Sequence, residues 1–218
     1  AIADLDMTNN TFEAADIAAV NLAQSNGNVE DILLNDSTVR ATNGDGIVID
    51  DSNGQNTRDV KIEDNTITAS DAAVSLQSDD GGTTSIDIVR NDIVDSTTGV
   101  LVDDTDGANV NFNDITGNDV GIEDNDGADL TALANYYGDS GPSGEASGDE
   151  FFGTGDEIDA DSGGDTFTPY LTQPVDELPR DEYVVVTDPR NVFDSDASPG
   201  TAYFDTTNGR IAVAVLDD

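Results

Sequence analysis

The chain contains the stretch Val60-Lys61-Ile62-Glu63-Asp64-Asn65-Thr66-Ile67-Thr68, and this stretch recurs in altered form. The next copies read Ile86-Asp87-Ile88-Val89-Arg90-Asn91-Asp92-Ile93-Val94 and Asn109-Val110-Asn111-Phe112-Asn113-Asp114-Ile115-Thr116. Each copy has an asparagine between two short apolar-polar alternations. Six asparagines stand in this frame, at successive gaps of 25, 30, 26, 22 and 22 residues: Asn10, Asn35, Asn65, Asn91, Asn113 and Asn135. Repeats of this length are typical of stacked structural units.

Each repeat is predicted to hold three short strands, because Ile and Val alternate with Asp, Thr and Asn. An aliphatic residue or alanine stands three places before each asparagine, and a bulky residue usually stands two places after it. The second copy departs from the frame, with Ser37 at that later place. A third strand opens with a small residue, as at Ala73, Gly99 and Gly121, and in the second copy at Gly46. The longest gap follows the second copy, where we expect an outward loop.

Strands this short favour a solenoid, in which each strand pairs in parallel with its counterpart one coil away. The chain then rises about 4.8 Å per coil and stacks its apolar residues into one core. The asparagine is expected to mark a sharp bend, because Asn tolerates the left-handed conformation. Stacked Asn amides can also bond from coil to coil.

The frame resembles the right-handed parallel β-helix (PbH1-type) repeat family, from Ala1 to about Pro174. The segment Leu133-Ala-Asn135-Tyr-Tyr-Gly138-Asp-Ser-Gly-Pro142 is similar to the ending of many surface-exposed β-helix proteins, and Thr166-Phe-Thr-Pro-Tyr-Leu171 is similar to its tail. The resemblance implies an all-β fold of about six coils over 1–138 and an acidic loop or cap over 139–174 that closes the helix end. Residues 175–218 are predicted to form a strand and hairpin segment, with Asn208-Gly209 at the turn. The acidic composition makes the closest resemblance one to surface proteins of halophilic archaea or their viruses.

The chain has 7 basic and 47 acidic residues among 218, a formal net charge of −40. Self-repulsion at this charge is severe in dilute buffer and is screened at molar salt, where the Debye length is about 3 Å. Adaptation to high salt and acidic disorder both fit such a composition. Periodic apolar residues favour the folded halophilic protein, because disordered segments lack such a pattern.

Several classes of partner and chemistry are excluded by composition. Binding phosphate requires clustered Lys and Arg, so neither nucleic acid nor an anionic membrane is an expected partner. No apolar run reaches the length of about 18 residues that direct membrane insertion needs. The chain has no Cys and no His, which removes thiolate ligands and the commonest general base. Because Leu5 and Met7 already occupy repeat positions, we expect a processed chain or a piece of a longer one.

An acidic turn follows the third strand of most repeats, and stacking would align these turns into one ridge. Oxygen-rich turns suit Ca²⁺ or Mg²⁺ or, at high salt, monovalent cations, and we expect no other cofactor. The candidate ligands are Asp104, Asp106, Asp124, Asp126, Asp159, Asp161 and Asp165. Neither of the first two pairs has the closing Glu of a calcium loop, so a solvated acidic turn is the alternative interpretation.

The sequence favours a non-enzymatic structural or adhesive module, extracellular on a cell surface, appendage or virion in high salt. Its expected partners are neighbouring copies, other surface proteins or polysaccharide. The alternative is a carbohydrate-active β-helix, a polysaccharide lyase or hydrolase. Such a lyase needs a Lys or Arg base, but Lys61 and Arg90 do not obviously converge on an acidic groove. Asn9 begins an Asn-Asn-Thr sequon and is the predicted glycosylation acceptor if the protein is secreted.

Overall fold

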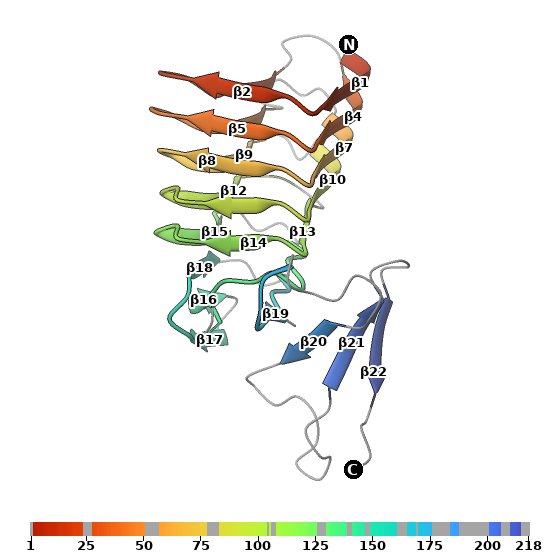
Figure 1. The fold of residues 1–218 in the computed structure, drawn as a ribbon, viewed down its shortest axis with the longest axis vertical. Helices are drawn as coiled ribbons and strands as arrows, with labels where there is room; N and C mark the ends of the chain where they lie inside the picture. The colour runs from red at the N-terminus through yellow and green to blue at the C-terminus, as the bar shows by residue number, and fades with distance from the viewer. Residues whose placement is uncertain are drawn as a thin grey trace.

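The protein is a right-handed parallel β-helix of stacked coils, seen in a computed structural model (Figure 1). The structure describes residues 2–23, 28–50, 57–77, 83–103, 105, 108–125, 130–138, 141–146, 149–160, 165–168 and 170–175, and the strands 184–187, 201–205 and 210–214. Within these residues each of the first five coils contributes one strand to each of three sheets. The predicted fold class is confirmed.

The three sheets are built from corresponding strands of successive coils, all paired in parallel in the first five coils. The first sheet contains β1 (Ile2–Thr8), β4 (Val29–Asn35), β7 (Thr57–Glu63), β10 (Thr83–Val89) and β13 (Ala108–Asn111). The second contains β2 (Thr11–Ala14), β5 (Thr38–Ala41), β8 (Thr66–Ala69), β11 (Asp92–Val94) and β14 (Asp114–Thr116). The third contains β3 (Val20–Ala23), β6 (Ile47–Asp50), β9 (Ala72–Gln77), β12 (Thr98–Asp103) and β15 (Val120–Asp124), and β18 (Glu157–Ala160), β16 (Ser143–Ala146) and β17 (Asp149–Phe152) extend it.

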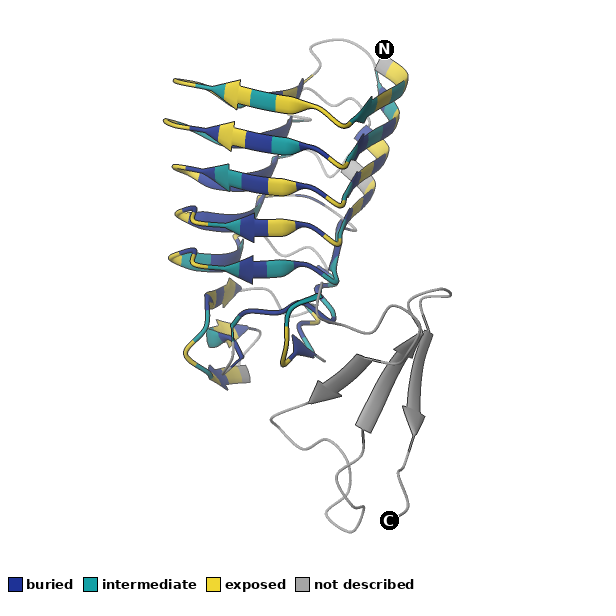
Figure 2. Ribbon diagram, in the orientation of Figure 1, coloured by how far each residue is buried: buried dark blue, intermediate teal, exposed yellow. Residues whose placement is uncertain are grey.

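The core lies between the sheets and consists of apolar rows that run from coil to coil. One row contains Met7, Leu34, Ile62, Ile88 and Val110, which are partners in register across the first sheet. Another contains Phe12, Val39, Ile67, Ile93 and Ile115 in the second sheet. Buried and exposed residues alternate along the strands (Figure 2). Full burial of one such side chain stabilises the fold by about 1.5–3 kcal/mol, so this alternation fixes the register.

The register corrects one of the six predicted corner positions. Thr8 pairs with Asn35, and Asn35 pairs with Glu63, so Asn35 ends β4 and is not a corner residue. Ser37 directly precedes β5, just as Asn65 directly precedes β8. The prediction was wrong by two residues because the aliphatic pattern before Asn35 imitates the frame. Ser37 fits the frame fully, with Leu34 three places before it and Val39 two places after.

The small residue at the start of the third strand has a steric cause. A Cβ on Gly99 would lie 2.4 Å from the carbonyl oxygen of Gly121 in the next coil, and one on Gly46 would lie 2.5 Å from that of Ala73. Neighbouring backbones therefore approach too closely here for most side chains. The outward loop expected after the second copy falls on residues 51–56, outside the described residues.

A sixth coil and a partial seventh close the C-terminal end of the core. Thr131 and Tyr136 bridge to the first and second sheets, and β18 pairs in parallel with β15 as the third strand of the sixth coil. The β16–β17 hairpin is inserted before β18. Thr166 and Leu171 then bridge to Thr131 and Tyr136. The range 139–174 thus includes a coil strand besides the cap, while the division of the chain into three domains stays a prediction.

The end of the core is covered by four buried apolar side chains from the cap: Phe151, Phe167, Tyr170 and Leu171. The rings of Phe151 and Phe167 meet edge to face, with centroids 6.4 Å apart. After the cap, β19 (Tyr170–Leu171), β20 (Val184–Thr187), β21 (Thr201–Asp205) and β22 (Arg210–Ala214) form an antiparallel sheet. The predicted tail strands are confirmed, and the Asn208-Gly209 turn lies outside the described residues.

Candidate functional site

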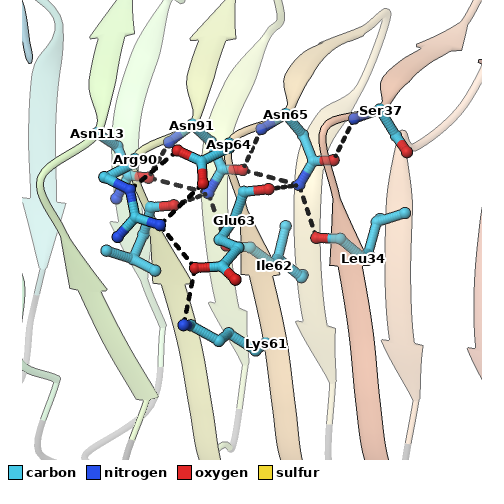
Figure 3. A network of polar contacts seen from close by, with 11 residues as sticks. Leu34, Ser37, Lys61, Ile62, Glu63, Asp64, Asn65, Arg90, Asn91 and Asn113 are labelled. Atoms are coloured by element: carbon cyan, nitrogen blue, oxygen red, sulfur yellow. Dashed lines mark hydrogen bonds and ion pairs between the residues drawn. The ribbon is translucent and has the colours of Figure 1, made fainter. Parts of the chain in front are cut away.

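The corner between the first and second sheets holds a continuous ladder of hydrogen bonds (Figure 3). In each buried rung the side-chain oxygen accepts the backbone N–H of the corner residue one coil earlier. Asn65 donates to Asn91 Oδ1 at 3.0 Å, Asn91 to Asn113 at 2.9 Å, and Asn113 to Asn135 at 2.9 Å. Ser37 takes its place in the series: its N–H donates to Asn65 Oδ1 at 2.9 Å, and its Oγ accepts the N–H of Asn10 at 3.0 Å.

The amide nitrogen of each rung is bonded as fully as the oxygen. Asn91 Nδ2 donates to the carbonyl of Ile62 at 2.8 Å and to Asn113 Oδ1 at 3.0 Å. The Asn91 residue is only 2% exposed. An unbonded polar group at such a site would cost about 1–3 kcal/mol, so each rung depends on the coils on both sides. Asn10 lies at the end of the stack and is exposed, and its side-chain amide donates to the carbonyl of Thr8 in the same coil.

The bend itself is made by the residue before the ladder position, not by the ladder residue as the sequence suggested. That residue has a positive φ between 48° and 57° in all six coils: Asn9, Asp36, Asp64, Arg90, Phe112 and Ala134. Asn and Asp adopt this conformation most readily, which explains the first three coils. Because the preceding residue adopts the left-handed backbone conformation, the side chain of the ladder asparagine can point into the corner.

Two basic residues meet on one carboxylate beside this corner (Figure 3). Lys61 Nζ lies 2.7 Å from Glu63 Oε2, and Arg90 Nη2 lies 2.7 Å from the same oxygen. Arg90 also binds Asp64 through Nε at 2.9 Å and through Nη2 at 2.8 Å. Lys61 and Arg90 thus meet at Glu63, while the expectation that they do not converge on an acidic groove stays a prediction. Stacking brings them together because Val89 pairs with Glu63, which sets Arg90 beside Asp64.

A third basic residue of the same sheet is paired with a carboxylate of its own. Arg58 Nη2 lies 2.9 Å from Glu30 Oε2, and hydrogen bonds from Asn28 and Arg58 hold the pKa of Glu30 below its usual range. Hydrogen bonding to Asp64 raises the pKa of Arg90. The three cations are about half exposed, so their ion pairs are worth little at molar salt.

A second polar ladder lies at the corner before the third sheet, and the sequence analysis did not identify it. Ser96 N–H donates to Asn118 Oδ1 at 3.0 Å, and Ser96 Oγ accepts the N–H of Ala69 at 2.9 Å. Asp156 of the cap ends this ladder by accepting the N–H groups of Gly117 at 3.0 Å and Asn118 at 2.9 Å, and Asn118 Nδ2 at 2.8 Å. The 22-residue spacing of Ser96 and Asn118 is a sequence signal, whereas Asp156 follows an insertion and breaks the period.

Burial raises the pKa of the Asp156 carboxyl above its usual range. Its residue is 9% exposed, and desolvation outweighs the three N–H donors that favour the charged form. Burial also raises the pKa of Tyr137, whose ring fills the core at the sixth coil. Asp156 therefore connects the cap to the coil stack through hydrogen bonds, while its burial disfavours the charged form of the carboxylate.

Three of the seven predicted cation ligands lie among the described residues, and cation binding at the seven positions stays a prediction. Asp124 is buried at the end of β15, Asp159 is exposed on β18, and Asp165 Oδ1 accepts the N–H of Leu130 at 2.9 Å. The remaining four, Asp104, Asp106, Asp126 and Asp161, lie outside the described residues. No group of three or more His, Cys, Asp or Glu suited to a metal ion occurs in the described part of the chain. Asn9 is exposed, and its glycosylation stays a prediction.

These coils, ladders and capped end define a right-handed parallel β-helix protein. Residues 3–148 match the family described as periplasmic copper-binding protein (NosD), and the chain belongs to that family. Neither the curated proteins nor the solved structures compared with the chain gave a match. No helix in the described ranges is long and apolar enough to span a membrane.

Replacing a buried ladder residue is expected to be far more damaging than the same change at Asn35. Asn91→Ala removes an acceptor from Asn65 and leaves the Ile62 carbonyl without its amide donor, which should lower the free energy of unfolding by about 2–5 kcal/mol. Asn35→Ala should change it by less than about 0.5 kcal/mol, because Asn35 lies outside the ladder. Urea unfolding at constant molar KCl measures both. Equal losses would mean that Asn35 is a rung.

The titration of Asp156 should appear in the pH dependence of stability. The pKa of Asp156 in the folded protein is raised above the ordinary value of 3.8. The stability that Asp156 contributes is therefore fully present below that pH and is lost as the pH rises through the folded-state pKa. Between these two pKa values the free energy of unfolding of the wild type should therefore fall relative to that of Asp156→Asn. At higher pH the free energies of the two proteins should change in parallel. Urea unfolding of both proteins at matched ionic strength gives the difference. If the difference in free energy of unfolding does not change with pH, or if the wild type gains stability as the pH rises, burial does not raise the pKa of Asp156.

Proposed function

We propose that this chain is a non-enzymatic structural or adhesive module that acts outside the cytoplasm in a high-salt environment, on a cell surface, appendage or virion. The observation that carries this proposal is the unbroken corner ladder, whose buried polar groups bind the neighbouring coils and leave a stiff rod. The rod holds its outward side chains at fixed spacing. Neighbouring copies, other surface proteins or polysaccharide are the contacts that such a rod would make.

Location and environment are supported by different observations. The family description is of a periplasmic protein, which supports action outside the cytoplasm. The net charge of −40 supports high salt, because the core is apolar and, among the described residues, the acidic side chains other than Asp124 and Asp156 are exposed or partly exposed. A folded chain of this charge gains most from screening by molar salt.

A second candidate function, polysaccharide cleavage, is favoured by the meeting of Lys61 and Arg90 at Glu63 and Asp64. A lyase joins a basic residue to an acidic cluster in this way. Here, however, Glu63 and Asp64 are already occupied by Arg90, and Lys61 Nζ donates to Glu63 at 2.7 Å. The arrangement satisfies its own charges, which supports the structural role.

Incubation with anionic and neutral polysaccharides in molar salt separates the two functions. We expect no shortened chains and no unsaturated ends, which absorb in the ultraviolet, from the native protein. Arg58→Ala is the matched control for Lys61→Ala, since both cations are half exposed on the same strand and each pairs with one glutamate. Turnover that is lost in Lys61→Ala and kept in Arg58→Ala would overturn the structural proposal and establish the lyase.

One column of carboxylates shows how the exterior depends on salt. Asp4, Asp31 and Asp59 occupy equivalent positions in β1, β4 and β7. The residues directly before and after each of them pair with their counterparts in the neighbouring strand. All three are exposed and have φ between 53° and 55°, and Ser85 takes the place in the fourth coil. Like charges about 5 Å apart repel by about 1 kcal/mol in water of low salt.

Removing this column of charge should lower the salt requirement of folding. In Asp4→Asn/Asp31→Asn/Asp59→Asn the left-handed backbone is kept, because Asn tolerates it as well as Asp does. At low salt the variant should be more stable than the wild type by about 1–2 kcal/mol, and at molar KCl the gain should vanish. Thermal unfolding over a KCl series measures this. A gain that persists unchanged at molar KCl would show that repulsion is not its cause.

A further inference from the structure

The copper named in the family description sets a chemical test for this chain. Cu(I) prefers thiolate and thioether ligands, and Cu(II) prefers imidazole nitrogen with oxygen. The 218 residues contain no Cys and no His, and their one methionine is Met7. Met7 is partly buried, packs against the core, and stands in register with Leu34 in an inward row. A single thioether used for packing is not a copper site.

The oxygen ligands that the chain does offer suit other ions. Carboxylates are hard ligands, which favour Ca²⁺, Mg²⁺ or monovalent cations over copper. At the best-formed polar cluster, Glu63 and Asp64 are held by Lys61 and Arg90. The inner polar groups are likewise committed, since the ladder amides bond from coil to coil.

The family match covers residues 3–148, which include five complete coils and the start of the sixth. What these coils share is the stacking frame: an inward aliphatic residue or methionine, a left-handed residue, a polar corner residue (Asn or Ser) and a second inward apolar residue. None of these four features supplies a metal ligand. We infer that this chain keeps the scaffold of its family without a copper site, so that membership here reflects the stacking frame and not metal chemistry.

Copper retention by the native protein tests this inference. The protein is mixed with Cu(II), or with Cu(I) under reducing anaerobic conditions, in molar KCl with excess Ca²⁺, and is then desalted. The native chain should retain no stoichiometric copper, because its carboxylates exchange copper for the competing hard cation. The Cu(II) bound before desalting should give an oxygen-only electron paramagnetic resonance spectrum.

A gain-of-site variant shows that the assay detects copper on this scaffold. Thr38 and Thr66 are register partners on the outward side of the second sheet, where Val39 and Ile67 point inward. Thr38→His/Thr66→His should retain about one equivalent of Cu(II), with nitrogen couplings in its spectrum, at least about tenfold more tightly than the native chain. Copper retained by the native chain at one equivalent per molecule would overturn the inference. Loss of that copper in Met7→Leu would then identify the thioether as its ligand.

Discussion

The whole structure depends on a buried amide that only a neighbouring coil can satisfy. Each corner residue accepts from the coil before it through its side-chain oxygen and donates to the coil after it through its backbone N–H. Such a network is strong when complete and costly when broken. A coil is therefore stable only inside a stack, and the stack needs a C-terminal end in which Tyr137, Asp156 and the cap aromatics replace the next coil.

The same constraint leaves the exterior almost free. Register, corner and core are set by inward residues, so the outward positions can carry nearly any side chain that a strand tolerates. In this chain they carry carboxylates, and stacking sets those carboxylates in columns such as Asp4, Asp31 and Asp59. Repeating a charge every coil concentrates repulsion along the rod. A fold with a net charge of −40 must offset this repulsion with its core and its ladders, and dissolved salt weakens the repulsion by screening.

The sequence predicted the sheets well because inward residues recur at every coil, whereas features made between coils were missed or misplaced. Asn35 was taken for a rung because Ile32 and Leu34 are both aliphatic, so two registers fit the second copy. The bend was assigned to the asparagine, although Asp64 and Arg90 adopt the left-handed backbone. Lys61 and Arg90 meet only once the strands are paired in register. Asp156 could not be placed because an insertion separates it from Asn118.

Membership of a solenoid family constrains the fold more strongly than the chemistry. The match extends over five coils, and in these coils the inward and corner positions must repeat for the stack to form. A ligand set needs only a few outward residues, and these can change without any effect on the core. In this chain acidic residues outnumber basic ones by 47 to 7, and the single thioether, that of Met7, packs against the core. The scaffold therefore constrains the inward positions of each coil and leaves the chemistry of its surface to the outward ones.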